Sequence, residues 1–349
     1  MISLHPSLVS PAAEALSGSV TTLCSNVVNA ENLALTRNQR LFVSGRDGVY
    51  ELTRSADGGC DTELVPVRVP GVPDQCMLNG IVAHDDCLYL ACAHIDEASI
   101  PLIPAALGDV NRTEQTAIGL LRGYLETMVC PVDSYIVRCD LSQTPLAFTD
   151  LLACLPGHVM ANGITTDADG RNLYIANSAP GMAAGIYRIP LNGAGDRSEA
   201  TLWCRPPGCK PNGLKVQDDV LYYTGNGAVA AVLGSVPIGQ GGVAGAPRVI
   251  DTGGLGVDDF DLADGGFVVA QFSKNMFPGS GFLCFLSRDG RELAALKRAE
   301  IANPSAVAIA RESSALFRAG DVVIVDKERH GASLFEPDAR WRKWLLGTA

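Results

Sequence analysis

The sequence predicts an all-β protein, a six-bladed β-propeller formed by a single domain over residues 1–349. Two observations lead to this prediction: one strand-turn-strand pattern occurs six times, and its copies start at intervals typical of a propeller blade. The starts are 48, 83, 50, 46 and 45 residues apart. A four-stranded blade needs about 40–50 residues, so each short interval corresponds to one blade and the long interval carries an insertion.

Each copy begins with a polar residue, followed by a small residue, an aliphatic strand, a turn and a second strand. The copies are ENLALTRNQRLFVSG from Glu31, NGIVAHDDCLYLACAH from Asn79, NGITTDADGRNLYIANS from Asn162, NGLKVQDDVLYYTGNG from Asn212, DDFDLADGGFVVAQF from Asp258 and the weaker NPSAVAIARESSALFRAGDVVIVD from Asn303. Turn pairs such as Asp169-Gly170 separate the strands, and a third strand follows, as in GVYEL or GIYRIPL. Six such units close a ring that leaves only short sheet edges.

The long interval places an insertion of about residues 95–133 inside the second blade, between His94 and Ser134. Its segment NRTEQTAIGLLRGYLETMV has the spacing of an amphipathic helix. The apolar face of this helix comprises Ile118, Leu121, Tyr124, Leu125 and Met128. We therefore expect a helical insertion near one mouth of the central channel. It could be a lid over a site, a packing element or an interface, and the sequence leaves these alternatives open.

Composition and charge exclude several classes of function. The formal net charge is −11 and Lys and Arg form no cluster that could neutralise phosphates, so we expect no nucleic-acid partner. No apolar run approaches the roughly 18 residues of a membrane-spanning helix, so we expect no membrane partner. The N-terminus has no basic region ahead of an apolar stretch, which predicts a cytoplasmic protein without a secretory signal.

The sequence contains eleven cysteines, which is a high and odd number. Secreted disulfide scaffolds are usually much shorter than this chain, so we expect free, buried thiols in a reducing compartment. Cys204 and Cys209 are close enough in sequence to close a small bridged loop, and a disulfide between them stays an alternative.

The polar residue that opens each repeat is a candidate ligand for a bound ion. Equivalent positions on the innermost strands of a propeller converge on its axis, so alignment of the repeats by the aliphatic residues that follow brings six residues together, and the sixth is Ser305 rather than Asn303. They are Glu31, Asn79, Asn162, Asn212, Asp258 and Ser305. Asn-Gly and Asp-Asp pairs also occur simply as turn formers, but their recurrence in register over five repeats favours a site.

The chemistry of these residues points to a divalent cation. Carboxylates and amide carbonyls are hard oxygen donors, which Ca²⁺ prefers. Neighbouring carboxylates, such as those of Glu31, Asp258 and Asp259, would repel one another unless a cation lay between them. We therefore expect Ca²⁺, or another divalent cation. Its expected ligands are Glu31, Asn79, Asn162, Asn212 and Asp258.

At this point the repeats resemble a known group of proteins. The stretch MANGITTDADGRNLYIANS looks like the Asn-Gly blade signature of the calcium-dependent six-bladed propellers of the senescence-marker-protein/gluconolactonase, paraoxonase and strictosidine-synthase-like superfamily. The resemblance covers nearly the whole chain, and it implies that Glu31, Asn162 and Asn212 are metal ligands. It also implies a ligand pair at Asp258 and Asp259, which resembles the Asp-Asn pair of paraoxonases.

The second blade resembles the paraoxonase blade that carries a catalytic histidine dyad. In NGIVAHDDCLYLACAHID, His94 falls on the second histidine, whereas Asn79 replaces the first, as in the gluconolactonase-like branch. Two departures accompany this resemblance. Asn212 stands where the gluconolactonase branch has a candidate catalytic Asp in its fourth blade, and Asn303-Pro-Ser shows no match to the sixth-blade Glu of the strictosidine-synthase branch. No branch's catalytic signature is therefore intact in this chain.

We expect a Ca²⁺-dependent enzyme that hydrolyses a lactone or ester in a small-molecule substrate. The metal would polarise the carbonyl group, and the base that activates water would be His94, Asp259 or His158. An unperturbed histidine titrates near about pH 6.5, which suits a base at neutral pH. Two alternatives stay open: a non-hydrolytic condensing, isomerising or lyase enzyme of secondary metabolism, and a metal-stabilised propeller that binds a ligand without catalysis.

Overall fold

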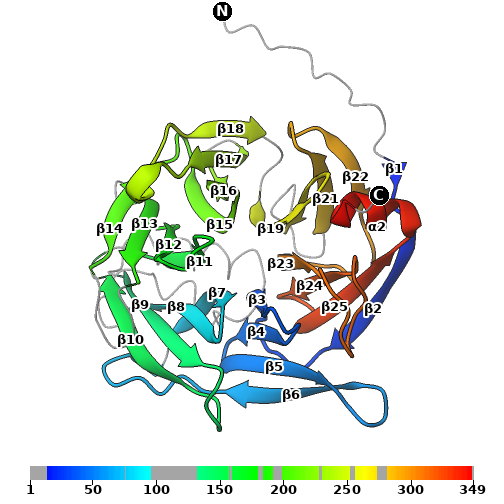
Figure 1. The fold of residues 1–349 in the computed structure, drawn as a ribbon. Helices are drawn as coiled ribbons and strands as arrows, with labels where there is room; N and C mark the ends of the chain where they lie inside the picture. Colours follow the sequence, from blue (N-terminus) through cyan, green and yellow to red (C-terminus); the bar gives the residue numbers. More distant parts are fainter. Residues whose placement is uncertain are drawn as a thin grey trace, which may run out of the picture.

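A computed structural model of the protein describes residues 14–74, 76–95, 132–155, 157, 159–179, 184–191, 199–227, 230–251, 256–272 and 281–347. These residues form six β-sheets that are arranged as blades around a common centre (Figure 1). The prediction of an all-β, six-bladed propeller is therefore confirmed. Within the described ranges, no helix is long and apolar enough to cross a membrane.

Blades 1, 2 and 3 follow one another along the chain, and each runs from an inner strand to an outer strand. Blade 1 consists of β3 (Asn32–Leu35), β4 (Leu41–Gly45), β5 (Gly48–Arg54) and β6 (Cys60–Val65). Blade 2 consists of β7 (Met77–His84), β8 (Cys87–Ile95), β9 (Val132–Asp140) and β10 (Phe148–Leu155). Blade 3 consists of β11 (Ala161–Thr166), β12 (Asn172–Asn177), β13 (Gly185–Pro190) and β14 (Thr201–Cys204).

Blades 4 and 5 continue in the same order, whereas blade 6 combines the two ends of the chain. Blade 4 consists of β15 (Lys210–Gln217), β16 (Val220–Asn226), β17 (Ala231–Pro237) and β18 (Arg248–Asp251), with the short 3-10 helix η3 (Gln240–Gly242) after β17. Blade 5 consists of β19 (Val257–Ala263), β20 (Gly266–Gln271), β21 (Phe282–Ser287), β22 (Glu292–Leu296) and β1 (Glu14–Ala15). Blade 6 consists of β23 (Pro304–Ile309), β24 (Val322–Asp326), β25 (Gly331–Pro337) and β2 (Gly18–Cys24).

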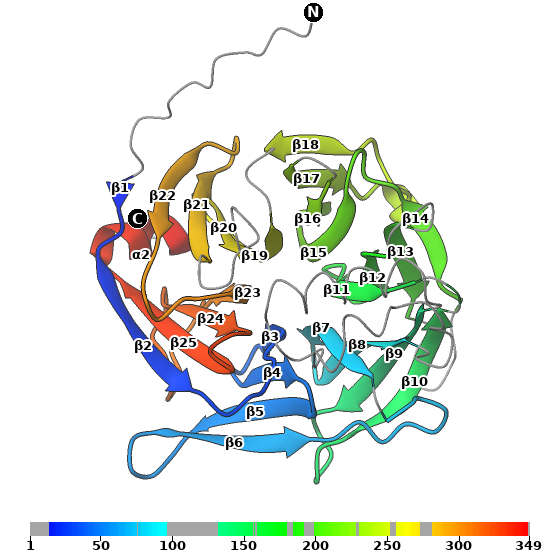
Figure 2. The ribbon, with the colours of Figure 1, turned by 180° about the vertical axis from the view of Figure 1, so that it is seen from behind.

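The ring is closed by pairing between strands from opposite ends of the chain. Strand β2 forms the outer edge of blade 6 and pairs antiparallel with β25, with Val20 opposite Phe335 (Figure 2). Strand β1 adds in parallel to β22 at the outer edge of blade 5. These pairings fasten the segment that precedes blade 1 to blades 5 and 6 by backbone hydrogen bonds, which closes the ring of blades.

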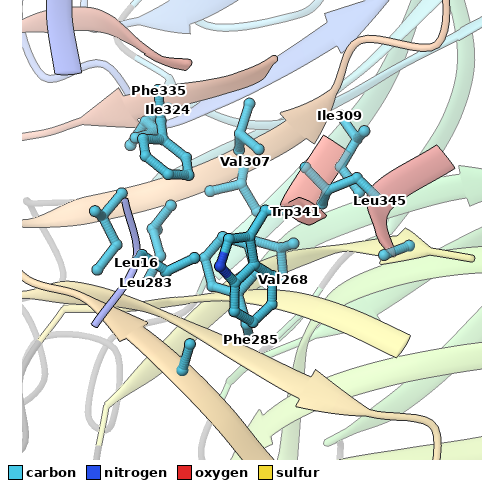
Figure 3. Close-up of a cluster of buried hydrophobic side chains, with 14 of the residues drawn as sticks. Leu16, Val268, Leu283, Phe285, Val307, Ile309, Ile324, Phe335, Trp341 and Leu345 are labelled. Carbon is cyan, nitrogen blue, oxygen red and sulfur yellow. The ribbon is translucent and has the colours of Figure 1, made fainter. Parts of the chain in front are cut away.

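The core lies between neighbouring blades, where the apolar faces of the sheets pack on one another. The cluster between blades 5 and 6 also contains the helix α2 (Ala339–Leu346), whose Trp341 packs edge-on against Phe285 at a ring-centroid distance of 5.4 Å (Figure 3). Asp338 caps this helix, because its side chain accepts a hydrogen bond of 3.0 Å from the Trp341 backbone N–H. The C-terminal helix is therefore packed against blades 5 and 6, where the ring closes.

The extra chain length leaves blade 2 between its second and third strands, as the sequence predicts. Strands β8 and β9 pair directly, with Ile95 opposite Val132, and residues 96–131 connect them. The predicted helix with its apolar face lies outside the described residues. Its proposed role as a lid, a packing element or an interface therefore stays a prediction.

Candidate functional site

The six inner strands surround the centre of the ring (Figure 1). Their pairing with the second strand of each blade shows how the repeats align. The equivalent pairs are Leu33 with Val43, Ile81 with Leu90, Ile164 with Ile175, Leu214 with Tyr223, Phe260 with Val269 and Val307 with Ile324. Two positions before the first member of each pair lie Glu31, Asn79, Asn162, Asn212, Asp258 and Ser305. We call these six equivalent positions the axial ring, and the predicted alignment of the repeats is correct.

In blades 2 to 5 the axial-ring residue lies in a β-bulge rather than in a turn. The ladder shifts register between Leu78 and Ile81 in blade 2, and at the equivalent place in blades 3, 4 and 5. A Cβ atom on Gly80 would lie 2.2 Å from the backbone oxygen of Asn162 in the next blade. Neighbouring inner strands therefore approach so closely that glycine is needed after the asparagine, which is why Asn-Gly recurs here.

A lysine from blade 6 joins carboxylates from blades 1 and 5 at the centre of the ring. The Lys327 Nζ atom lies 2.7 Å from Oε2 of Glu31 and 3.0 Å from Oδ2 of Asp258. Asn212 of blade 4 donates a hydrogen bond of 2.9 Å from Nδ2 to the other carboxylate oxygen of Asp258. A single hydrogen-bonded group thus contains four residues from four blades, namely Glu31, Asn212, Asp258 and Lys327.

A second lysine pairs with the neighbouring carboxylate. Lys215 of β15 places its Nζ atom 3.1 Å and 3.0 Å from the two carboxylate oxygens of Asp259. Asn32 of blade 1 also donates to Asp259, from Nδ2 to Oδ2 at 3.3 Å. We call Glu31, Lys215, Asp258, Asp259 and Lys327 the axial cluster. It contains three carboxylates and two ammonium groups, and each carboxylate has at least one ammonium partner.

The asparagines of blades 2 and 3 lie on the other side of the ring and make a different kind of contact. Asn79 is buried and donates a hydrogen bond of 2.7 Å from Nδ2 to the backbone oxygen of Ala161 in the next blade. The hydroxyl of Ser44 donates to the backbone oxygen of Asn79 at 2.8 Å. Asn162 is half-buried at the equivalent position of blade 3. Blades 2 and 3 therefore contribute amides and no charged group to the axial ring, and the amide of Asn79 joins blade 2 to blade 3.

Burial changes the protonation chemistry of the axial cluster. Burial raises the pKa of Glu31 to about 7; the ammonium of Lys327 opposes this change and the carboxylate of Asp258 adds to it. Burial also raises the pKa of Asp259, although Lys215 opposes it. Burial acts to lower the pKa of Lys327, but the carboxylates of Asp258 and Glu31 outweigh burial, and the pKa lies above its ordinary value. Glu31 is therefore the carboxyl group that exchanges a proton near neutral pH.

The axial cluster does not fit Ca²⁺ in this arrangement. Both carboxylate oxygens of Asp258 and both of Asp259 already accept hydrogen bonds, and an added cation would lie beside two ammonium groups. Among the described residues, no group of three or more His, Cys, Asp or Glu side chains is placed so that it could hold a metal ion. Calcium stays a prediction of the sequence, and its binding at Glu31 and Asp258 would require the Lys327 ammonium to move away.

The three predicted bases have different positions. Asp259 belongs to the axial cluster, but it is almost fully buried and both of its oxygens face Lys215. His94 is half-buried near the end of β8, the second strand of blade 2, where it pairs across the ladder with Asp133. His158 lies outside the described residues. The structure thus brings Asp259 together with the predicted ligands Glu31 and Asp258, and places His94 on the second strand of blade 2, which pairs with the inner strand β7.

Neither lysine of the axial cluster is among the site residues predicted from the sequence. Lys215 lies on the inner strand β15, two residues after Gly213, so its side chain leaves the strand on the same face as that glycine. Lys327 directly follows β24, whose five residues are all buried. A charged residue within an inner strand, and a lysine directly after a buried strand, were the available signals.

The cysteines agree with the prediction of unbridged thiols. Cys204 and Cys209 are both free thiols, and so are Cys24, Cys60, Cys76, Cys87, Cys92 and Cys139. Burial raises the pKa of the Cys209 thiol to about 11, so this thiol is protonated at neutral pH. The alternative of a small bridged loop at this place is therefore not supported.

Comparison with known proteins supports the fold alone. No protein-family model matches the chain, and no curated protein matches it significantly. A putative oxidoreductase (glucose dehydrogenase) from Thermus thermophilus has a similar structure, with a TM-score of 0.53 and 14% identity over 92% of this chain and all of that one. The PQQ-bound aldose sugar dehydrogenase from Streptomyces coelicolor is also similar, with a TM-score of 0.53 and 17% identity over 94% of this chain and 98% of that one.

Proposed function

We propose that the protein is an enzyme that hydrolyses a lactone or ester of a small polar molecule at the axial cluster. The observation that carries this proposal is the convergence of three carboxylates and two ammonium groups from blades 1, 4, 5 and 6 at the centre of the ring. A hydrolase needs positive charge for the carbonyl oxygen and a base for water. The axial cluster contains both kinds of group.

The two lysines are the candidates for stabilising the oxyanion. Their side chains are about a quarter exposed, 24% for Lys327 and 26% for Lys215, so each reaches the space next to the axial cluster. An ammonium N–H directed at the substrate carbonyl would stabilise the negative charge that forms on its oxygen when water attacks. This role replaces the one that the sequence analysis assigned to Ca²⁺, and no step of the proposal uses a metal.

Glu31 is the candidate base, in place of Asp259. Its side chain is 17% exposed against 3% for Asp259, and its pKa of about 7 suits proton transfer at neutral pH. The ionised carboxylate would accept a proton from the attacking water. It would then return this proton to the leaving oxygen as the carbon–oxygen bond of the lactone breaks, and a hydroxy acid would leave.

The test is hydrolysis of a panel of lactones and aryl esters, with and without EDTA, followed by pH-stat or absorbance. Sugar-derived lactones belong in the panel, because one similar structure is named as an aldose sugar dehydrogenase. We expect turnover that EDTA does not change. Absence of turnover from the folded wild type would contradict the proposal and favour the binding alternative.

Variants of two residues identify the base. We expect Glu31→Gln to lower kcat by about 100-fold or more, because it removes the proton acceptor and keeps the shape of the side chain. Glu63→Gln on the exposed outer strand β6 is the matched control and should retain activity. A loss of this size in His94→Gln, with Glu31→Gln active, would return the role of base to His94.

A further inference from the structure

We infer that the ammonium group of Lys327 is the resident cation of the axial cluster, so that the cluster is complete without a metal ion. The inference concerns ion binding and stability, and it holds whatever reaction the protein catalyses. It also makes a prediction about a variant: removal of Lys327 should create a site for a divalent cation. Four features of the structure support it.

The first feature is the position of the Lys327 ammonium between carboxylates of two blades. Its Nζ atom lies 2.7 Å from Glu31 and 3.0 Å from Asp258, which occupy the axial-ring positions of blades 1 and 5. Blade 6, which lies between them, has the uncharged Ser305 at this position. The Ser305 hydroxyl donates to the backbone oxygen of Ala30 at 3.0 Å. Blade 6 thus contributes a cation where a carboxylate would increase the repulsion.

The second feature is the way the backbone around Lys327 is held. The preceding residue, Asp326, is buried, and its carboxylate accepts hydrogen bonds from four backbone N–H groups at 2.7–3.0 Å. The four donors are Ala302, Asn303, Glu328 and Arg329. The Lys327 N–H itself donates to the backbone oxygen of Asn303 at 3.1 Å. The backbone from which the Lys327 side chain extends is therefore held by hydrogen bonds that do not involve its ion pairs. This lowers the entropic cost of forming those ion pairs.

The third feature is the occupancy of the carboxylate oxygens. Lys327 and Asn212 donate to the two oxygens of Asp258, and Lys215 donates to both oxygens of Asp259. A calcium ion needs about six to eight oxygen ligands, so it would have to displace these N–H donors from the same lone pairs. The ammonium groups and the metal therefore compete for one set of oxygen atoms.

The fourth feature is the charge balance. Three carboxylates and two ammonium groups leave one negative charge when all are ionised, and a divalent ion would reverse its sign. Without Lys327, three carboxylates and one ammonium group leave two negative charges. A divalent cation balances that charge, and the space and oxygens of the Lys327 ammonium become available to it.

The experiment compares wild type and Lys327→Met by calorimetric titration with CaCl₂ and by thermal unfolding, both after EDTA treatment. For the wild type we expect no saturable calcium binding and a change in Tm of less than about 1 °C on adding Ca²⁺. For Lys327→Met we expect a lower Tm that Ca²⁺ raises, and a calcium Kd at least about tenfold below any found for the wild type. Lys343→Met, on the exposed face of α2, is the control and should behave as wild type.

A second variant keeps the test decisive if Lys327→Met does not fold without calcium. Asp258→Asn combined with Lys327→Met removes one charge of each sign, so we expect it to fold in EDTA and to bind no Ca²⁺. Tight calcium binding by the wild type, with a Tm that EDTA lowers, would overturn the inference. So would a Lys327→Met variant as stable as wild type and indifferent to Ca²⁺.

Discussion

The two sides of the axial ring use different chemistry on the same backbone geometry. Blades 4, 5, 6 and 1 hold the axial cluster of Glu31, Lys215, Asp258, Asp259 and Lys327. Blades 2 and 3 hold the amide arc, Asn79 and Asn162, and the side chain of Asn79 donates a hydrogen bond to the backbone of the next blade. Bulges occur at the ring position on both sides. The repeat therefore determines where a side chain points, and the residue type determines what it does there.

The difference shows how a propeller accommodates buried charge. A buried carboxylate is destabilising unless an opposite charge or several hydrogen-bond donors face it. In the axial cluster, Lys327 and Lys215 come from blades next to those that contribute the carboxylates. In the amide arc, Asn79 needs a single acceptor and finds it in a neighbouring backbone oxygen. Changes in the axial cluster should therefore cost more stability than changes in the amide arc, and the following predictions test that order.

The largest effect should come from Asp259→Asn. This change keeps the shape of the side chain but leaves the Lys215 ammonium beside a neutral amide, and removing one partner of a buried ion pair costs about 3–5 kcal/mol. The measurement is the midpoint of urea unfolding. Asp259→Asn combined with Lys215→Met is the matched control, which should recover most of the loss. A single variant as stable as the wild type would place the stabilisation elsewhere.

A smaller effect should come from the titration of Glu31. Its folded-state pKa of about 7 lies above the usual 4.5, so the stability linked to its proton is complete below the usual pKa and is lost as the pH rises through about 7. Over that range the loss is at most about 3 kcal/mol. We expect wild type to lose stability relative to Glu31→Gln between about pH 5.5 and pH 8, measured by urea midpoints. Parallel curves for the two proteins would contradict the raised pKa.

The lower limit of that pH range avoids the isoelectric point, which is about 4.9 for this sequence. At the isoelectric point the net charge approaches zero and the protein would tend to associate. The comparison of two variants at each pH also cancels the contributions of all other titrating groups.

The smallest effects should come from the amide arc. Asn79→Ala removes the 2.7 Å hydrogen bond to the backbone of Ala161, and we expect a loss of about 1–2 kcal/mol. Asn162→Ala is the matched control, because the side chain of Asn162 makes no hydrogen bond to the described part of the chain. We expect it to change stability by less than about 0.5 kcal/mol. Equal losses in the two variants would mean that the ring position, and not the hydrogen bond, carries the stabilisation.

The repeat was readable from the sequence because its physical cause is local. Each inner strand needs apolar residues such as Ile164 and Phe260 at positions that pack against the preceding blade, and this need recurs with every blade. The glycine that follows each asparagine was also visible in the sequence, but the structural cause of its recurrence was not. Gly80 was compatible with a turn or a site, and the structure shows a third cause, a bulge packed against a neighbouring strand.

The partners of the carboxylates were not readable from the sequence. Lys215 lies 44 residues before Asp259 in the chain, and Lys327 lies 69 residues after Asp258. Neither lysine occupies an axial-ring position, so alignment of the repeats could not bring them to the centre. The carboxylates do face positive charge, and in the structure this charge comes from the side chains of Lys215 and Lys327.

The sequence by itself determined the all-β class, the number of blades, the alignment of the axial ring and the place where extra chain leaves blade 2. These features follow from the periodicity of apolar residues and from the spacing between repeats, both of which are properties of short segments. Only the tertiary structure decided which charges meet at the centre, because electrostatic pairing depends on distances of about 3 Å between residues of different blades. Those distances exist only after the ring has closed.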